Sequence, residues 1–188
     1  MSTTRPLRVL FASLLGALGV ACASAPPTIA PVEQVDLARF MGDWYVIAHI
    51  PSRPERDAYN AIESYALQPD GSIQTTFRFR DGGFDRPLET MRPRGFVRPG
   101  TGNAVWGMQF VWPIKAEYVI VHVDPGYTQT IVGRSKRDYA WIMARTPTLP
   151  EAEYTAAVAR LQALGYSLDG LRRVPQQWPE AGGPRPQR

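Results

Sequence analysis

The stretch Phe40-Met41-Gly42-Asp43-Trp44-Tyr45-Val46-Ile47-Ala48 places a Gly-x-Trp motif at the start of an apolar strand. Glycine can adopt backbone angles closed to other residues, which suits a chain that turns sharply into a sheet. The tryptophan buries a large apolar surface and needs a hydrogen-bond partner for its indole. Many β-proteins start a strand in this way, so the motif gains meaning from a second run, Arg137-Asp138-Tyr139-Ala140-Trp141-Ile142-Met143-Ala144-Arg145. We predict that the two runs close one end of a β-barrel whose other end admits an apolar ligand.

Short stretches with the character of strands follow one another along most of the chain. Residues 73–80 alternate between apolar or small and polar side chains, a period of two that indicates a half-buried strand. Pro93 interrupts the segment 88–97, which favours an edge or a bulge. Residues 104–112 are apolar on both faces, which favours a barrel with an apolar interior over a half-solvated sheet. The eight predicted strands span 44–50, 62–67, 73–80, 88–97, 104–112, 118–123, 127–132 and 139–145, joined by short turns as in a meandering barrel or sandwich.

After the strands the apolar period changes to that of a helix. Thr148, Pro150 and Glu151 fit a capping box with Thr148 as the N-cap, and Gly165 is placed to end the helix. We therefore predict one amphipathic helix packed on the outside of the sheet. We also expect a helical turn over 36–40 and a last short strand within 168–174. The predicted apolar stripe of the helix consists of Tyr154, Ala157, Val158, Leu161 and Leu164.

Length and charge limit the possible roles. The 188 residues, 44% of them hydrophobic, suffice for one domain with a sizeable core and processed ends. Arg5 and Arg8 precede a short apolar run over 9–20, a pattern typical of an export signal and too short to span a membrane. Without these two arginines the net charge falls from +4 to +2. We therefore predict no nucleic-acid partner.

Cys22, the single cysteine, lies where the export signal should be cleaved. The segment Leu18-Gly19-Val20-Ala21-Cys22 resembles a bacterial lipobox, although it has Gly19 where leucine is usual. We predict lipidation at Cys22, with palmitate-type acyl chains holding the protein to a membrane, and Ala23 favours the outer membrane. The alternative is an incidental Cys22 with cleavage after Ala23. The predicted organisation is a signal segment 1–22, a flexible tether 23–34, a barrel with its helix over 35–175 and a loose tail 176–188.

The pattern over residues 35–178 resembles the lipocalins, in particular the bacterial lipoprotein lipocalins related to apolipoprotein D. The resemblance is carried by residues 42–48, by 137–142, by Ala144-Arg145-Thr146-Pro147-Thr148, by the closing helix and by Val174-Pro175-Gln176-Gln177. It implies an all-β fold, an eight-stranded antiparallel up-and-down barrel with one C-terminal helix outside it. It also implies that Arg145 lies across the Trp44 indole, and that Asp138 and Tyr139 match the family's Asp-Tyr pair near the closed end, with Arg137 in place of a threonine. The implied barrel-closing motif is Gly42, Trp44, Asp138, Tyr139 and Arg145.

Every second residue of each strand in such a barrel faces the interior. The parity set by Trp44 and Arg145 selects the interior candidates on the first and last strands. A packed core built from the same side chains is the alternative, because small differences in side-chain size decide whether an eight-stranded barrel is filled or hollow. The predicted ligand-binding residues are Val46, Ala48, Phe77, Phe79, Trp106, Met108, Phe110, Tyr139, Trp141 and Met143.

The resemblance implies a lipid-anchored envelope protein that binds or transports a small apolar ligand such as a fatty acid or lysophospholipid. No cofactor or metal is implied. Arg53, Arg56 and Tyr59 lie in a loop after the first strand and are candidates for a polar head group, with a solvated loop as the alternative. Haem, carotenoid and antibiotic ligands stay open, and the sequence assigns no oligomeric state.

Two other functions are weighed against binding. An envelope protein with a filled barrel would have only a structural or interaction role. For an enzyme, the two histidines, His49 and His122, lie on different strands without metal-ligand spacing. Glu63, Glu117 and Asp138 are carboxylates without an obvious partner. We therefore predict that the protein is not an enzyme.

Overall fold

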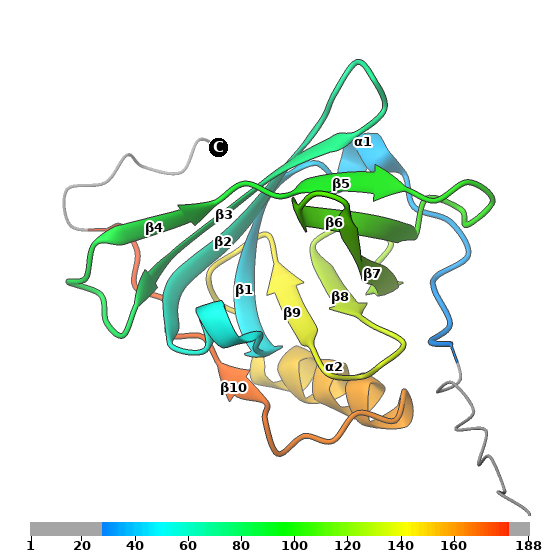
Figure 1. Cartoon of the computed structure of the whole chain (residues 1–188). Coiled ribbons are helices and arrows are strands. Elements are labelled where there is room, and N and C mark those ends of the chain that lie inside the picture. The colour runs from blue at the N-terminus through cyan, green and yellow to red at the C-terminus, as the bar shows by residue number, and fades with distance from the viewer. Residues whose placement is uncertain (1–27, 181–188) are drawn as a thin grey trace, which may run out of the picture.

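A computed structural model describes residues 28–180 of the chain. The chain in this range is mostly strand, with two helices and one short 3-10 turn (Figure 1). The elements are α1 (Leu37–Phe40), β1 (Gly42–Ile50), η1 (Arg53–Glu55), β2 (Ala58–Leu67), β3 (Ile73–Asp81), β4 (Leu88–Met91), β5 (Arg94–Val97), β6 (Val105–Val111), β7 (Ile114–Val123), β8 (Gln129–Gly133), β9 (Ala140–Ala144), α2 (Glu151–Ala163) and β10 (Arg172–Arg173).

The strands form a closed antiparallel barrel in which neighbours follow the chain order from β1 to β9, except that β4 and β5 share a partner. The barrel closes because β1 also pairs with β9, with Tyr45 opposite Ala144 and Ile50 opposite Ala140. β4 and β5 both pair with β3 and together make one strand interrupted around Pro93. Counted in this way, residues 28–180 contain an eight-stranded barrel, which confirms the predicted fold class and the break at Pro93.

The C-terminal segment enters the wall of the barrel between β1 and β2. These two strands pair only from Gly42 opposite Tyr65 to Tyr45 opposite Ile62, and beyond that β10 pairs with β1. The side-chain amide of Gln176 bridges the gap, donating to the carbonyls of Val46 at 2.9 Å and Ala61 at 3.2 Å.

The prediction of a loose tail over 176–188 is therefore wrong for residues 176–180. Asn60 exchanges hydrogen bonds with the Gln177 backbone, and Glu180 forms an ion pair with Arg80 at 3.1 Å. Trp178 packs edge-on against Tyr45, with ring centroids 5.4 Å apart. Residues 181–188 lie outside the described range.

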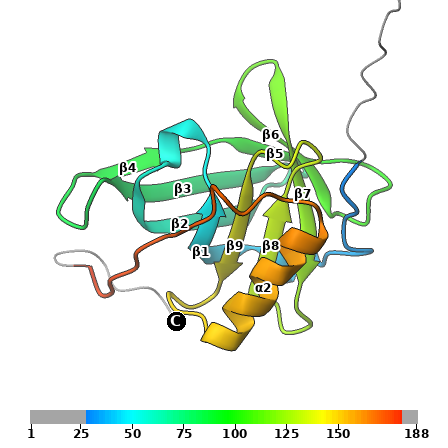
Figure 2. The same ribbon diagram turned by 90° about the horizontal axis from the view of Figure 1, so that it is seen from below.

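The helix α2 covers the outer face of β1, β8 and β9 (Figure 2). Ala157 and Leu161 are its buried residues, and they join an apolar cluster on the outside of the barrel. The predicted capping box is wrong, because Pro150 is the N-cap and no side chain caps the helix. The predicted end is confirmed: Gly165 has φ +86° and donates to the carbonyl of Gln162.

A β-bulge in β1 divides its residues between two apolar clusters. The pairing with β9 shifts between Val46 and Ala48, so the alternation of side chains breaks there. Val46 lies in the cluster inside the barrel, whereas Ala48 belongs to the outer cluster beneath α2. The expectation that Ala48 faces the interior is therefore wrong, because one extra residue in a strand reverses the faces that follow it.

The segment before α1 is packed against the barrel. Ile29 is buried in the outer cluster, and Val32 donates a backbone hydrogen bond of 3.0 Å to Ile120. Val35 is fully buried inside the barrel. The predicted tether over 23–34 is thus wrong for residues 28–34, while its first part and the predicted export signal lie outside the described residues.

Within residues 28–180, neither helix is long and apolar enough to cross a membrane.

Candidate functional site

The closed end of the barrel is built around Trp44. Its indole Nε1 donates a 2.8 Å hydrogen bond to the carbonyl of Phe40, and the Arg145 guanidinium lies 3.7 Å from the ring centroid. Arg145 also donates to the carbonyls of Asp43 and Met41 at 2.7 and 2.8 Å. This arrangement confirms the predicted pairing of indole and guanidinium, a contact that stabilises by about 0.5–2 kcal/mol.

Gly42 allows this close packing at the start of β1. Its φ of +91° is a conformation that other residues rarely adopt, and a Cβ placed there would lie 3.4 Å from Arg145 Nη1. Burial lowers the pKa of Arg145 to about 10, so the guanidinium is still charged at neutral pH.

Asp138 and Tyr139 lie at the opposite end of the barrel, so their predicted closing role is wrong. Ala140 pairs with Ile50, the last residue of β1, whereas Ala144 pairs with Tyr45 near its start. Arg145 follows Asp138 by seven positions, most of them in the extended strand β9, which corresponds to about 23 Å.

The turn between β7 and β8 has the role at the closed end that was predicted for Asp138 and Tyr139. Asp124 accepts backbone hydrogen bonds from Gly126, Thr128 and Gln129. The Tyr127 hydroxyl accepts a 2.8 Å hydrogen bond from the Asp36 backbone.

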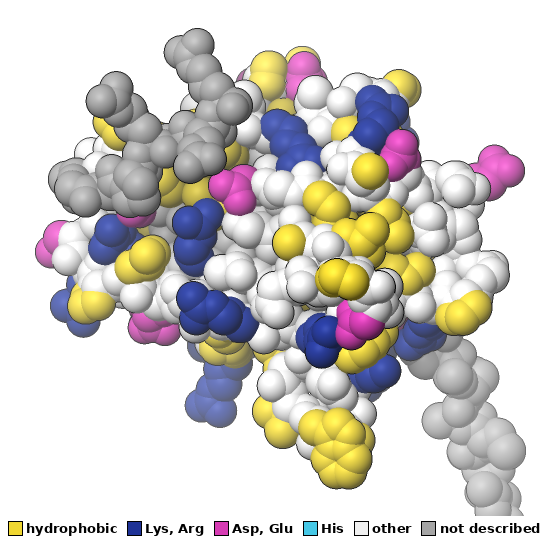
Figure 3. Space-filling model, turned by 90° about the horizontal axis from the view of Figure 1, so that it is seen from above, with side chains coloured by type: hydrophobic (Ala, Val, Ile, Leu, Met, Phe, Trp, Pro, Cys, Tyr) yellow, Lys and Arg dark blue, Asp and Glu magenta, His cyan; other side chains and the backbone are white. Residues whose placement is uncertain are grey.

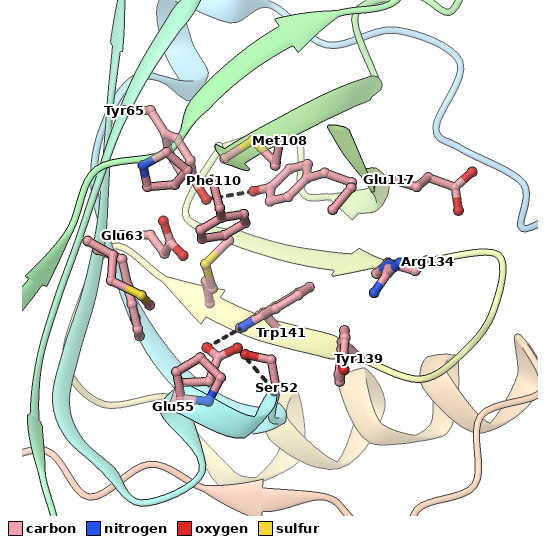
Figure 4. Close-up of a pocket in the computed structure, with 17 residues that line it drawn as sticks. Ser52, Glu55, Glu63, Tyr65, Met108, Phe110, Glu117, Arg134, Tyr139 and Trp141 are labelled. Atoms are coloured by element: carbon pink, nitrogen blue, oxygen red, sulfur yellow. Dashed lines mark hydrogen bonds between the residues drawn. The ribbon is translucent and has the colours of Figure 1, made fainter. Parts of the chain in front are cut away.

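A cavity of about 280 Å³ occupies the barrel interior beyond this plug (Figure 4). Its volume lies just below the range of about 300–1,000 Å³ usual for small-molecule pockets. The lining is largely apolar and aromatic. It consists of Ser52, Pro54, Glu55, Glu63, Tyr65, Phe77, Met91, Pro93, Met108, Phe110, Ala116, Glu117, Tyr118, Arg134, Tyr139, Trp141 and Met143.

Six of the ten predicted ligand-facing residues line this cavity: Phe77, Met108, Phe110, Tyr139, Trp141 and Met143. Val46, Phe79 and Trp106 belong to the packed core of the barrel and are not among its lining residues. Ala48 lies outside, as described above. The barrel is therefore filled by side chains around Trp44 and Trp106 and hollow beyond them.

Phe110 differs from the other lining residues because it is 59% exposed. It leads into the β6–β7 hairpin, which projects from the barrel (Figure 2). Val111, Trp112 and Ile114 at the tip are also exposed, and Figure 3 shows hydrophobic side chains gathered on a projection at the lower edge of the molecule. The apolar lining thus continues onto the surface of this hairpin.

Glu63 on β2 brings a carboxylate into the cavity (Figure 4). Its Oε2 atom is buried, and within residues 28–180 no group donates a hydrogen bond to it. Burial, followed by the negative charge of Glu55, raises the pKa of Glu63 to about 8. The side chain is therefore mostly neutral at pH 7. Nearby, the hydroxyls of Tyr65 and Tyr118 share a 2.7 Å hydrogen bond.

Glu55, from η1, is a second carboxylate in the lining. Its Oε1 accepts a 3.1 Å hydrogen bond from the Ser52 backbone, and its Oε2 accepts one of 3.0 Å from the Trp141 indole. His49 Nδ1 lies 3.9 Å from Oε2. Burial alone would raise the pKa of Glu55, but these polar neighbours outweigh it and hold the pKa below its usual value. Glu55 is therefore ionised at neutral pH, unlike Glu63.

The residues predicted to meet a head group are not among the lining residues. Arg53 and Arg56 are exposed, and Tyr59 packs against Phe84 with ring centroids 5.0 Å apart. Arg134, at the end of β8, is the one basic residue that lines the cavity within the described chain. It forms an ion pair of 3.2 Å with Asp138, and its guanidinium lies 5.0 Å from the Tyr139 ring centroid.

The two histidines lie in different environments. His49 is buried behind Glu55, while His122 lines a separate hollow of about 130 Å³ beside α2. Burial, followed by the charge of Arg160, lowers the pKa of His122. Across residues 28–180, no group of three or more His, Cys, Asp or Glu side chains is arranged to hold a metal ion.

Residues 35–176 match a family model described as "Lipocalin-like domain". The chain is 28% identical over 160 residues to temperature-induced lipocalin-1 of Arabidopsis thaliana, an alignment that covers 77% of this chain and 81% of that protein. It is also 28% identical over 177 residues to outer membrane lipoprotein Blc of Citrobacter freundii, covering 92% of this chain and 98% of the relative.

Solved structures share the fold at lower identity. Insecticyanin from the tobacco hornworm Manduca sexta superposes with a TM-score of 0.62 at 19% identity, covering 79% of this chain and 84% of that one. Lobster apocrustacyanin A1 gives 0.60 at 11% identity, covering 80% and 91%.

Proposed function

Because the chain belongs to the lipocalin family, we propose that it binds a single-chain lipid, such as a fatty acid or lysophospholipid, in the barrel cavity. One observation carries the proposal: an apolar cavity of about 280 Å³, lined by Phe77, Met108, Met143 and Trp141, beyond a sealed end. Each methylene buried there contributes about 0.8 kcal/mol, so an acyl chain needs no specific chemistry to bind. A fatty acid would enter chain first, with its carboxylate near Arg134.

The proposal extends to the location of the protein. Lipidation at Cys22 would anchor the domain to the outer membrane, and several relatives are named outer membrane lipoproteins. Such an anchor would keep the cavity near a supply of single-chain lipids. Transport between membrane and cavity, rather than catalysis, is the role we propose.

Binding to the purified, delipidated domain tests the first part. We expect a fluorescent fatty acid to bind with micromolar affinity or better at a stoichiometry of one. Filling the cavity with Met143→Trp should weaken binding at least tenfold. Leu88→Trp, an enlargement at an exposed side chain outside the lining, is the matched control and should leave binding unchanged. A titration without saturable binding would contradict the proposal and favour a barrel with only a structural role.

Mass spectrometry of protein extracted from its native membrane tests the second part. It reports the modification of Cys22 and any co-purifying ligand in one sample. We expect an acylated N-terminal cysteine, and an unmodified N-terminus beginning at residue 24 would contradict the anchor.

A further inference from the structure

The Glu63 carboxylate is an unusual group to find in an apolar barrel. Its Oε2 is buried, and no donor in residues 28–180 meets it with hydrogen-bond geometry, although buried polar atoms are nearly always paired. The neighbouring Tyr65 hydroxyl, which lowers the pKa of Glu63 in part, shares its 2.7 Å hydrogen bond with Tyr118. The side chain points into the cavity and not into the packed core (Figure 4). An acceptor left open at this position is therefore available to a ligand.

The surroundings of Glu63 favour a positively charged donor over an anion. Glu55 contributes a second carboxylate, close enough that its charge disfavours ionisation of Glu63. The basic residue of the lining, Arg134, is already paired with Asp138. An anion placed at this depth would face Glu55 without compensation, whereas a cation would meet both carboxylates.

The aromatic residues of the lining act in the same direction. The rings of Tyr118 and Trp141 are stacked with centroids 6.5 Å apart, and Phe77 also lines the cavity. Aromatic faces attract cations, most strongly where water is excluded. The apolar surface then leads outwards through Phe110 to the exposed hairpin, which gives an alkyl chain a path from the carboxylates to the mouth.

We propose that the cavity selects an amphiphile with a protonated amine at the end of an alkyl chain, with the ammonium group bound at the Glu63 carboxylate. The inference rests on the proposed function, because it assumes that the cavity takes a single apolar chain. A charged hydrogen bond of this kind is worth about tenfold or more in affinity.

Three probes of equal chain length test the selection: dodecylamine, dodecanol and dodecanoate, each titrated calorimetrically below its aggregation concentration. We expect dodecylamine to bind at least tenfold more tightly than dodecanol. Glu63→Gln keeps the shape of the side chain and should reduce this preference to threefold or less. Glu33→Gln, the same change at an exposed site outside the cavity, should leave the preference unaltered.

The pH dependence supplies an independent readout. The groups around the Glu63 carboxylate are Glu55, Tyr65 and Tyr118, with Glu117 and Arg134 elsewhere in the lining and His49 beside Glu55. An alkylammonium stays protonated from pH 6 to 8, as lysine does. Binding of the cation favours ionised Glu63, so dodecylamine should bind more tightly as pH rises from 6 to 8 and should release a proton. Both effects should vanish in Glu63→Gln.

The outcomes separate the inference from the function on which it rests. If all three probes bind equally, or if Glu63→Gln keeps the preference for the amine, the inference is wrong and the carrier function stands. If none of the probes binds, the proposed function fails as well. A 12-carbon lysophosphatidylethanolamine distinguishes the sources of the ammonium: tighter binding than dodecylamine would assign it to a lipid head group, and weaker binding to a free amine.

Discussion

The two ends of the barrel interior treat an ionisable side chain in opposite ways. At the closed end, Arg145 stacks on Trp44 and donates to the carbonyls of Tyr127, Asp43 and Met41. In the cavity, the Oε2 atom of Glu63 finds no donor among the described residues. A polar group whose hydrogen bonds are satisfied holds elements together, whereas an unpaired buried polar atom destabilises the fold and persists where a ligand can meet it. Stability is thus concentrated at one end and binding capacity at the other.

Removing the plug should have the largest effect. Trp44→Ala empties the centre of the closed end, and we expect a loss of about 3–5 kcal/mol in the free energy of unfolding. Urea titration followed by circular dichroism measures it. Trp112→Ala makes the same substitution at a side chain that is 82% exposed, and it should change stability by less than about 0.5 kcal/mol. Equal losses in the two variants would show that Trp44 does not plug the barrel.

Replacing Glu63 by a neutral residue should raise the free energy of unfolding near neutral pH, unlike the removal of Trp44. Its pKa is about 8 in the folded protein against 4.5 as the ordinary value, so between these pH values the folded state holds a proton that the unfolded state has lost. Stability therefore falls as pH rises through this window, by ~3 kcal/mol between pH 5 and 7.5. Below pH 4.5 both states are protonated, so the contribution of Glu63 is fully present there and no longer depends on pH.

Glu63→Gln should remove this slope, so that the variant gains on the parent protein as pH rises. Unfolding curves for both proteins at several pH values measure the difference. Glu33→Gln should follow the parent protein at every pH. A pH profile of Glu63→Gln parallel to that of the parent would mean that Glu63 titrates normally and has a partner.

A smaller loss of stability is expected when the backbone conformation at the closed end is disturbed. Gly42→Ala places a side chain at φ +91° and brings its Cβ to 3.4 Å from Arg145, which should cost about 1–2 kcal/mol. Gly170→Ala is the matched control, because its Cβ would meet Ile50 at an ordinary 3.5 Å. Thermal melts of the two variants should differ by several degrees. A harmless Gly42→Ala would show that β1 does not require this backbone conformation.

The smallest effect concerns the mouth. Arg134→Gln removes the basic group of the lining and should weaken fatty-acid binding about threefold, in the range of a partly screened ion pair. Arg53→Gln, at an exposed position outside the lining, should leave binding unchanged. Binding isotherms with a fluorescent fatty acid at fixed salt make the comparison. A larger loss of affinity in Arg53→Gln than in Arg134→Gln would indicate that the loop after β1 binds the head group.

The sequence predicts the barrel and its plug because those features are local and periodic. The assignment of Asp138 and Tyr139 to the closed end failed because two turns, 124–127 and 137–139, each carry an aspartate before a tyrosine. Counting strand directions from Trp44 would have placed the first of these turns beside the plug. The bulge that places Ala48 outside the barrel cannot be predicted from the residue types of β1.

The polar part of the cavity is only partly encoded in the strand pattern. Alternation along β2 places Glu63 on the same face as Tyr65. The expectation that a barrel interior is apolar nevertheless excludes a glutamate from the predicted lining. Glu55 could not be found in this way, because it reaches the cavity from a 3-10 turn without a strand period. Arg134 likewise follows the end of a strand.

The most direct measurement of the central claim is fluorescence quenching by a stearate with a nitroxide in mid-chain. Trp141 lines the cavity, whereas Trp178 packs on Tyr45 outside the barrel. We predict saturable quenching at one lipid per protein, largely lost in Trp141→Phe and retained in Trp178→Phe. Quenching that never saturates, or that disappears in Trp178→Phe but persists in Trp141→Phe, would contradict a barrel sealed at one end and loaded at the other.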